Sequence, residues 1–276
     1  MMVDLPSSGP SGHRSPRGGR HRSWLYGLLG AFALTGALVP TAAADVGAKI
    51  IGGDDATEPY PFMVSLQQAS NGMHFCGGSL VDDEWVVTAA HCAAGWAPGD
   101  ITTRIGSADR SSGGTVTGIS EIVVHPEYSM SPFHADIAVL KLDRPVEHEP
   151  IAIAEEAGPV GTPTRVLGWG MTCEDGAECP APPERLQQLD TELVTDENCT
   201  TDFDGATELC TDSPRENAQA CYGDSGGPQL QGRPGQWELI GATSGDGDDD
   251  PICATGPGIW TDVTAYADWI EQHVAA

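Results

Sequence analysis

The sequence predicts an all-β fold built from many short strands. Glycine and proline are frequent, at 35 and 21 of 276 residues, and short runs of valine, isoleucine and leucine lie between them. Such apolar runs bounded by turn residues are typical of strands. Only residues 265–274 place apolar side chains near helical spacing. We therefore expect a folded region made of strands, with one short helix at its C-terminal end.

Residues 1–44 are predicted to form a secretory signal peptide. A basic flank with four arginines precedes an apolar run over residues 24–39, and Pro40–Ala44 ends in small residues typical of a cleavage site. A transmembrane anchor is the alternative, but the run is shorter than the ~20 residues a spanning helix needs. We expect cleavage after Ala44 and a secreted, extracellular protein.

All eight cysteines follow this segment, and an even number in an exported chain indicates disulfides. No Cys-x-x-Cys or Cys/His cluster has zinc spacing. Spacing favours two local pairs, Cys173–Cys179 and Cys199–Cys210, and leaves the partners of the other four open.

The folded region is strongly acidic. Five of the 13 basic and two of the 40 acidic residues precede Ile50, which leaves 8 basic and 38 acidic side chains, a formal balance of −30. Such a charge repels phosphate backbones and anionic lipids, so we expect no nucleic-acid partner and no membrane partner once the signal is removed. The acidic run Asp246–Asp250 lacks the spacing of an EF-hand loop, and we predict no metal site and no cofactor.

A protease-sensitive junction is predicted between Lys49 and Ile50, after a short propeptide of residues 45–49. A lysine precedes two isoleucines and two glycines there. Cleavage would create an α-amine on Ile50, which could be buried only beside a carboxylate. Asp224, next to Ser225, is the candidate partner, so the pair could order this backbone after cleavage.

The segment Gly223-Asp224-Ser225-Gly226-Gly227 contains the candidate nucleophile. Glycines let a backbone approach a ligand closely, which suits a serine beside an oxyanion hole. The pattern fits both the nucleophile elbow of α/β-hydrolases and the Gly-Asp-Ser-Gly-Gly-Pro segment of chymotrypsin-like proteases.

His91 and Asp136 are the other two candidate catalytic residues. His91 follows the apolar run Trp85–Val87 among small residues, and Asp136 opens the apolar stretch Asp136–Leu140. A carboxylate entering a buried strand needs a specific partner, and an imidazole N–H would serve. The chain order His91, Asp136, Ser225 differs from the order Ser, Asp, His of the elbow enzymes, and residues 226–230 directly after Ser225 do not begin a helix.

With these motifs, the chain from Ile50 onward resembles the chymotrypsin/trypsin family of secreted serine proteases, as a bacterial-type member. The resemblance rests on five segments in order: Ile50–Gly53, Thr88–Cys92, Asp136–Leu140, Gly168–Gly170 and Gly223–Pro228. It implies two six-stranded antiparallel β-barrels, which we assign to residues 50–158 and 159–276, followed by a short C-terminal helix.

The resemblance also implies residue roles. Ser225 would be the nucleophile, His91 the base and Asp136 its orienting carboxylate, with the amides of Gly223 and Ser225 as the oxyanion hole. Ile50 and Asp224 would form the activation pair, and Ser244 would support Asp136. The implied disulfides are Cys76–Cys92, Cys199–Cys210 and Cys221–Cys253, which leaves Cys173 and Cys179 for each other.

The predicted specificity pocket departs from trypsin. Gln219 stands where trypsin-like members carry an acid, and a neutral amide cannot neutralise a lysine or arginine head group. Gly245-Asp246 replaces the usual Trp-Gly after Ser244, and Asp246 could narrow the pocket or place a carboxylate at its mouth. Gly258 keeps the small wall residue of an open pocket.

The predicted function is a secreted, monomeric serine endopeptidase made as a zymogen, which acts on proteins or peptides. Its P1 preference is expected to be neutral or chymotrypsin-like, so a different protease would cut after Lys49. The alternative is a non-catalytic binding homologue of the same fold.

Overall fold

The computed structural model describes residues 50–131, 133–173, 179, 181–200, 202–248, 250 and 252–275. The predicted signal peptide and propeptide, residues 1–49, lie outside the described residues. Among the described helices, none is long and apolar enough to cross a membrane.

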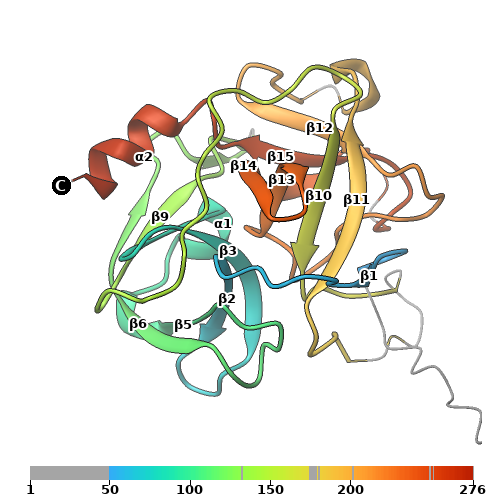
Figure 1. The fold of residues 1–276 in the computed structure, drawn as a ribbon. Coiled ribbons are helices and arrows are strands. Elements are labelled where there is room, and N and C mark those ends of the chain that lie inside the picture. Colours follow the sequence, from blue (N-terminus) through green and yellow to red (C-terminus); the bar gives the residue numbers. More distant parts are fainter. Residues whose placement is uncertain are drawn as a thin grey trace, which may run out of the picture. The chain divides into compact units, whose positions relative to one another are not determined.

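Six antiparallel strands form a closed barrel in the order β2-β3-β4-β9-β6-β5, which appears in cyan and green in Figure 1. Their bounds are β2 (Met63–Gln68), β3 (His74–Asp82), β4 (Trp85–Thr88), β5 (Ile101–Ile105), β6 (Thr115–Val124) and β9 (Ala138–Leu142). Strand β5 shows how the sequence produces a barrel wall, because Ile101, Thr103 and Ile105 are buried while the residues between them are partly exposed. The buried Thr103 hydroxyl is satisfied by Thr117 Oγ1 on β6, at 2.7 Å.

A second ring of six strands has the order β11-β10-β13-β14-β15-β12 and closes through pairing of β11 with β12. The bounds are β10 (Pro163–Gly168), β11 (Gln187–Leu193), β12 (Glu208–Asp212), β13 (Pro228–Arg233), β14 (Gln236–Asp246) and β15 (Gly258–Asp262). The two barrels confirm the predicted fold class. Strand β1 (Asp54–Asp55) pairs with β11, so the segment just after Ile50 is attached to the second barrel.

The predicted C-terminal helix is α2 (Ala267–Val274), two residues shorter at its start than the apolar pattern suggested. It follows the second barrel in the chain but packs on the first: the rings of Tyr266 and Trp269 lie 5.0 and 4.9 Å from that of His125. Ile270 is buried in the same apolar cluster as the first barrel. Figure 1 shows α2 beside β6 and β9.

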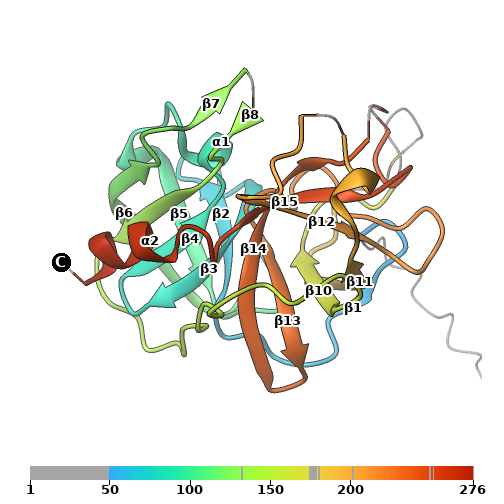
Figure 2. The same ribbon diagram turned by 90° about the horizontal axis from the view of Figure 1, so that it is seen from above.

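The remaining elements lie in loops. A small hairpin, β7 (Ser129–Met130) and β8 (Phe133–His134), stands beside α1 (Ala90–Ala93) in Figure 2. The structure also has two short 3₁₀ helices, η1 (Pro98–Asp100) and η2 (Asp196–Asn198). Four disulfides join Cys76 to Cys92, Cys173 to Cys179, Cys199 to Cys210, and Cys221 to Cys253.

Candidate active site

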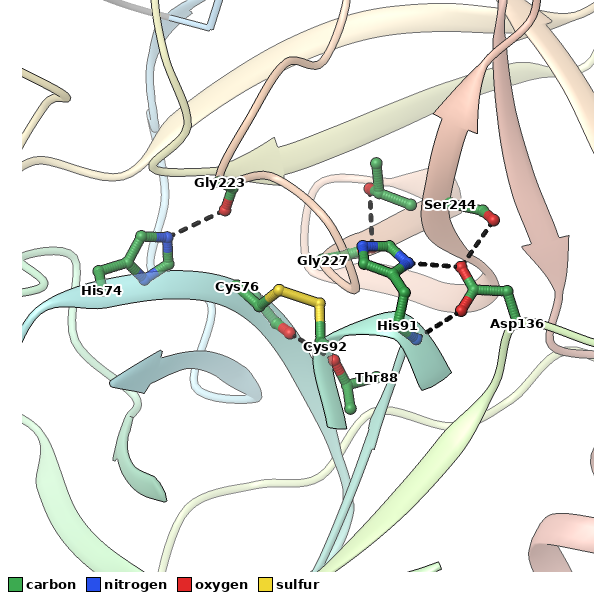
Figure 3. Close-up of a disulfide and its surroundings, with 11 residues drawn as sticks. His74, Cys76, Thr88, His91, Cys92, Asp136, Gly223, Gly227 and Ser244 are labelled. Atoms are coloured by element: carbon green, nitrogen blue, oxygen red, sulfur yellow. Dashed lines mark hydrogen bonds and ion pairs between the residues drawn. A yellow bond between two sulfur atoms is a disulfide. The ribbon is translucent and has the colours of Figure 1, made fainter. Parts of the chain in front are cut away.

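His91 and Asp136 meet at one edge of the first barrel. His91 lies in α1, directly after β4, and Asp136 lies just before β9, which pairs with β4. The Asp136 carboxylate accepts the His91 backbone N–H at 2.8 Å and lies 2.7 Å from His91 Nδ1 (Figure 3). Because an ionised carboxylate can only accept, Nδ1 carries the proton of a neutral ring and Nε2 presents its lone pair. That is the tautomer a general base requires.

Two residues of the second barrel hold Asp136 in place. Ser244 Oγ on β14 donates to Asp136 Oδ2 at 2.7 Å, and Thr261 Oγ1 on β15 donates to the Asp136 carbonyl at 2.8 Å. Asp136 is only 2% exposed, so the Ser244 bond satisfies a carboxylate that water hardly reaches, while the Thr261 bond holds the backbone that carries it. Both barrels therefore contribute to the position of one buried carboxylate.

Ser225 lies in the turn before β13, and its backbone is attached to the first barrel. The N–H of Gly77 on β3 donates to the Ser225 carbonyl at 2.7 Å. Gly226 has a φ of +72°, and a Cβ there would collide with Thr88 Oγ1 at the end of β4. Glycine is thus required where this turn meets the strand that leads to His91. Among the described residues no hydrogen bond joins Ser225 to His91, a contact that often tightens only when substrate binds.

Two backbone N–H groups of this turn are left free. The amides of Asp224, Gly226 and Gly227 donate to carbonyls of Cys221, Thr243 and Asp224 at 2.8–2.9 Å. Within the described part of the chain, those of Gly223 and Ser225 have no acceptor. Gly223 adopts a φ of +98°, which favours glycine. Two unpaired donors beside a serine hydroxyl are what an oxyanion hole needs.

Asp224 is enclosed beneath this turn. Its carboxylate oxygens accept the backbone N–H groups of Gly170, at 2.7 Å, and Cys221, at 3.0 Å. A Cβ on Gly168 or Gly170 would overlap the carboxylate, so glycines form the wall. Burial raises the pKa of Asp224 to about 7, although the two N–H bonds lower it in part. The described residues supply no cation as its partner, although Ile50 is fully buried in the second barrel's apolar cluster.

The predicted specificity residues line one pocket of about 100 Å³ that opens beside Ser225. Its lining is mostly apolar, with Ala220, Tyr222, Trp260 and the Cys221–Cys253 disulfide, and it includes Gln219, Ser244, Asp246 and Gly258. A Cβ on Gly258 would collide with the Trp260 ring and approach the Gln219 amide, so glycine keeps this wall open.

The two polar ends of the pocket differ. Gln219 is 1% exposed, and its Oε1 accepts the Ala220 N–H at 3.0 Å. Asp246 is exposed at the rim, where partial desolvation and the nearby Asp248 carboxylate raise its pKa. The buried end of the pocket, at Gln219, is therefore neutral. The carboxylate of Asp246 lies at the rim, in contact with solvent.

His74, on β3, is a further residue near the proposed oxyanion hole that the sequence motifs do not indicate. Its Nε2 is 3.0 Å from the carbonyl of Gly223 (Figure 3). Its ring packs edge-on against Trp169, with 5.6 Å between the ring centres. No local motif marks this histidine. Only its contact with a residue 149 positions away in the chain reveals it.

Near His91, the ligand-type atoms of Cys76, His91 and Cys92 lie within 4.8 Å of one another. Both sulfurs belong to the Cys76–Cys92 disulfide, so this cluster has no thiolate to bind a metal. The disulfide instead ties β3 to the helix that carries His91.

Comparison with known proteins agrees with this geometry. The family model described as Trypsin matches residues 50–270. Trypsin theta of Drosophila melanogaster is 36% identical over 233 residues, covering 80% of this chain and 85% of that protein. A trypsin of Saccharopolyspora erythraea is also 36% identical, covering 82% and 99%.

Among solved structures, human heparin binding protein aligns with a TM-score of 0.67 and 26% identity, covering 81% of this chain and 96% of that one. A histidine oriented by a carboxylate, a serine hydroxyl, and two free amides beside a pocket are the groups that acyl transfer requires. The chain belongs to the trypsin family and is a serine endopeptidase.

Proposed function

We propose that Ser225, His91 and Asp136 are the catalytic residues, with the amides of Gly223 and Ser225 as the oxyanion hole. His91 Nε2 takes the proton as Ser225 Oγ attacks the scissile carbonyl, and then gives it to the leaving amine. Water, activated by the same nitrogen, hydrolyses the acyl-enzyme. The observation that carries this assignment is the pair of free amides, because their neighbours in the same turn are all hydrogen-bonded.

Labelling with a serine-directed phosphonate tests the assignment. The cleaved protein should be labelled stoichiometrically, and the His91→Ala variant should not be. A fully folded wild-type protein that neither reacts nor hydrolyses peptides would support the non-catalytic binding homologue instead.

We further propose that the pocket selects neutral, preferably aromatic or large apolar, P1 side chains. A lysine or arginine head group would reach the buried amide of Gln219 rather than a carboxylate, and leaving such a charge unpaired costs several kcal/mol. Asp246 cannot offset this cost, since an exposed ion pair contributes at most about 1 kcal/mol. A P1-varied peptide library should therefore rank phenylalanine, tyrosine and leucine above lysine and arginine.

The protein is proposed to be secreted as a monomeric zymogen that another protease cuts after Lys49. Four disulfides fit an oxidising compartment. The carboxylate of Asp224, buried and without a cation among the described residues, would receive the new α-ammonium of Ile50. A neutral P1 preference excludes efficient self-cleavage after lysine.

Mixing active enzyme with the Ser225→Ala zymogen tests this last point. The inert zymogen should remain intact at Lys49–Ile50, while an added protease that prefers lysine or arginine at P1 should cut it. Rapid cleavage by the protein's own mature form would contradict both the separate activator and the neutral pocket.

A further inference from the structure

The carbonyl of Gly223 ends a chain of buried polar groups that begins far from the active site. His74 Nε2 contacts that carbonyl at 3.0 Å, and His74 Nδ1 lies 2.8 Å from Ser65 Oγ. Gln67 Nε2 then donates to Ser65 Oγ at 3.1 Å and to the carbonyl of Arg110 at 2.6 Å. Ser65 and Gln67 are both on β2, two residues apart, so they face the same side of the strand.

In each hydrogen bond of this chain, the chemistry of the two groups fixes which one donates and which one accepts. The Arg110 carbonyl can only accept, so the Gln67 NH₂ group must face it and its second N–H points to Ser65. The Gly223 carbonyl can also only accept, so His74 carries its proton on Nε2 and accepts from Ser65 at Nδ1. Burial of the imidazole lowers the pKa of His74 to about 4, aided by the charge of Arg110, although the residue keeps some exposed surface. The ring is therefore neutral at neutral pH, as this pattern requires.

Arg110 itself joins the two barrels. It lies between β5 and β6, and its Nε and Nη2 donate to the carbonyls of Pro183 and Pro182 at 2.8 and 3.0 Å. Its own N–H donates to the Glu184 carbonyl at 2.9 Å. The Arg110 carbonyl is consequently held on a backbone contact between the first barrel and the segment before β11.

Gly223 needs such an anchor because glycine restricts its own backbone least of all residues. Its N–H is a proposed oxyanion donor, and its carbonyl belongs to the next peptide plane. With that plane held by His74, and Asp224 held by Gly170 and Cys221, little freedom remains to turn the Gly223 N–H away from the substrate.

We propose that Gln67 is a positioning residue for the oxyanion hole: its amide connects the inter-barrel contact of Arg110, through Ser65 and His74, to Gly223. This rests on the function proposed for Gly223 and Ser225. It adds a specific expectation, since losing the amide should weaken transition-state binding while leaving substrate binding largely intact.

Gln67→Met removes both N–H donors and keeps the side chain's length. In the mature enzyme we expect kcat for an apolar-P1 peptide anilide to fall about tenfold, part of the 10²–10³ that full loss of an oxyanion donor costs. KM should change less than twofold. The affinity for the matching peptide aldehyde, whose serine adduct places its oxygen in the oxyanion hole, should fall by the same factor as kcat.

Gln68→Met is the matched control, because Gln68 is the next residue on β2 and, among the described residues, its Oε1 accepts only from Asn71 at the surface. It should leave all three constants unchanged. Ser65→Ala interrupts the same chain and should reproduce the Gln67→Met pattern, so it decides the question if Gln67→Met fails to fold in a thermal-unfolding assay.

Unchanged kcat and aldehyde affinity in the folded variants would overturn the positioning role, as would a rise in KM alone. Wild-type protein that is inactive and unlabelled by the phosphonate would instead refute the proposed function. The two failures are therefore distinguishable in one set of measurements.

Discussion

The two buried carboxylates of the proposed active site, those of Asp136 and Asp224, differ in the partners that the described residues provide for their negative charge. Asp136 has three donors, two from His91 and one from Ser244, and needs nothing more to orient the base. Asp224 has two backbone N–H donors, and burial still raises its pKa to about 7. Among the described residues, the proposed base therefore has the hydrogen bonds that orient it, whereas Asp224, next to the proposed nucleophile, has no cationic partner. Cleavage after Lys49 would act on the oxyanion turn and leave the base unaltered.

The largest expected effect is on the base side. Asp136→Asn should lower kcat by about 10⁴, the magnitude known for this change in Ser-His-Asp enzymes, because the amide stabilises the wrong imidazole tautomer. Steady-state kinetics of the cleaved protein provide the measurement. The control is Asp143→Asn, at an exposed carboxylate paired with Arg144, which should retain full activity. Activity in Asp136→Asn within tenfold of wild type would refute the role of this carboxylate.

The next largest effect is expected from Asp224, whose protonation should make the free energy of unfolding depend on pH. In the uncut protein the folded-state pKa of Asp224 is about 7, above the ordinary 3.8. Between these values the unfolded chain loses the proton that the folded chain retains, so this group's contribution to stability falls as pH rises and is constant above about 7. The total is roughly 4 kcal/mol, from about three pKa units at 1.36 kcal/mol each.

Urea unfolding of uncut Lys49→Gln protein, with and without Asp224→Asn, isolates this contribution. The difference in unfolding free energy between the two proteins should change by this amount from pH 4 to 8. In cleaved protein the Ile50 ammonium should lower the pKa of Asp224, so the difference should no longer fall as the pH rises from 4 to 8. A difference that does not vary with pH in the uncut protein would show that Asp224 already has a cationic partner.

The pocket carries the next largest effect. Gln219→Asp places a carboxylate at the buried end and should raise kcat/KM for P1 arginine relative to P1 phenylalanine by about 100-fold, since a buried charge is then paired. Gln219→Leu is the control, and it should not favour arginine. Equal preference in wild type and Gln219→Asp would mean that the head group binds elsewhere.

The smallest effect is expected at the rim. Asp246→Asn should change kcat/KM for P1 arginine peptides less than fivefold, and moderate salt should abolish the change, because exposed pairs are weak and screened. A large loss confined to arginine and lysine peptides would make Asp246 the true specificity carboxylate and refute the neutral pocket.

Much of the site could be predicted from local sequence. Ser225 among glycines, His91 after an apolar strand and Asp136 before another each lie in a context that packing alone does not explain, and their order distinguished two enzyme folds. The Ser65–Gln67–His74 chain could not be predicted, since polar residues on a strand indicate no partner until β2, β3 and the 223–227 turn lie together.

The sequence by itself determined the family and the residues of the proposed chemistry: a serine, a histidine and an aspartate in an order that fits one family, a neutral Gln219, and a lysine before Ile50. Within the part of the chain that the structure describes, only the tertiary structure decided which backbone amides have no acceptor, which buried carboxylate has no cationic partner, and which distant residues contact Gly223. The physical reason is that hydrogen bonds and burial depend on atoms brought together from segments as much as 149 residues apart, and no local pattern records their directions.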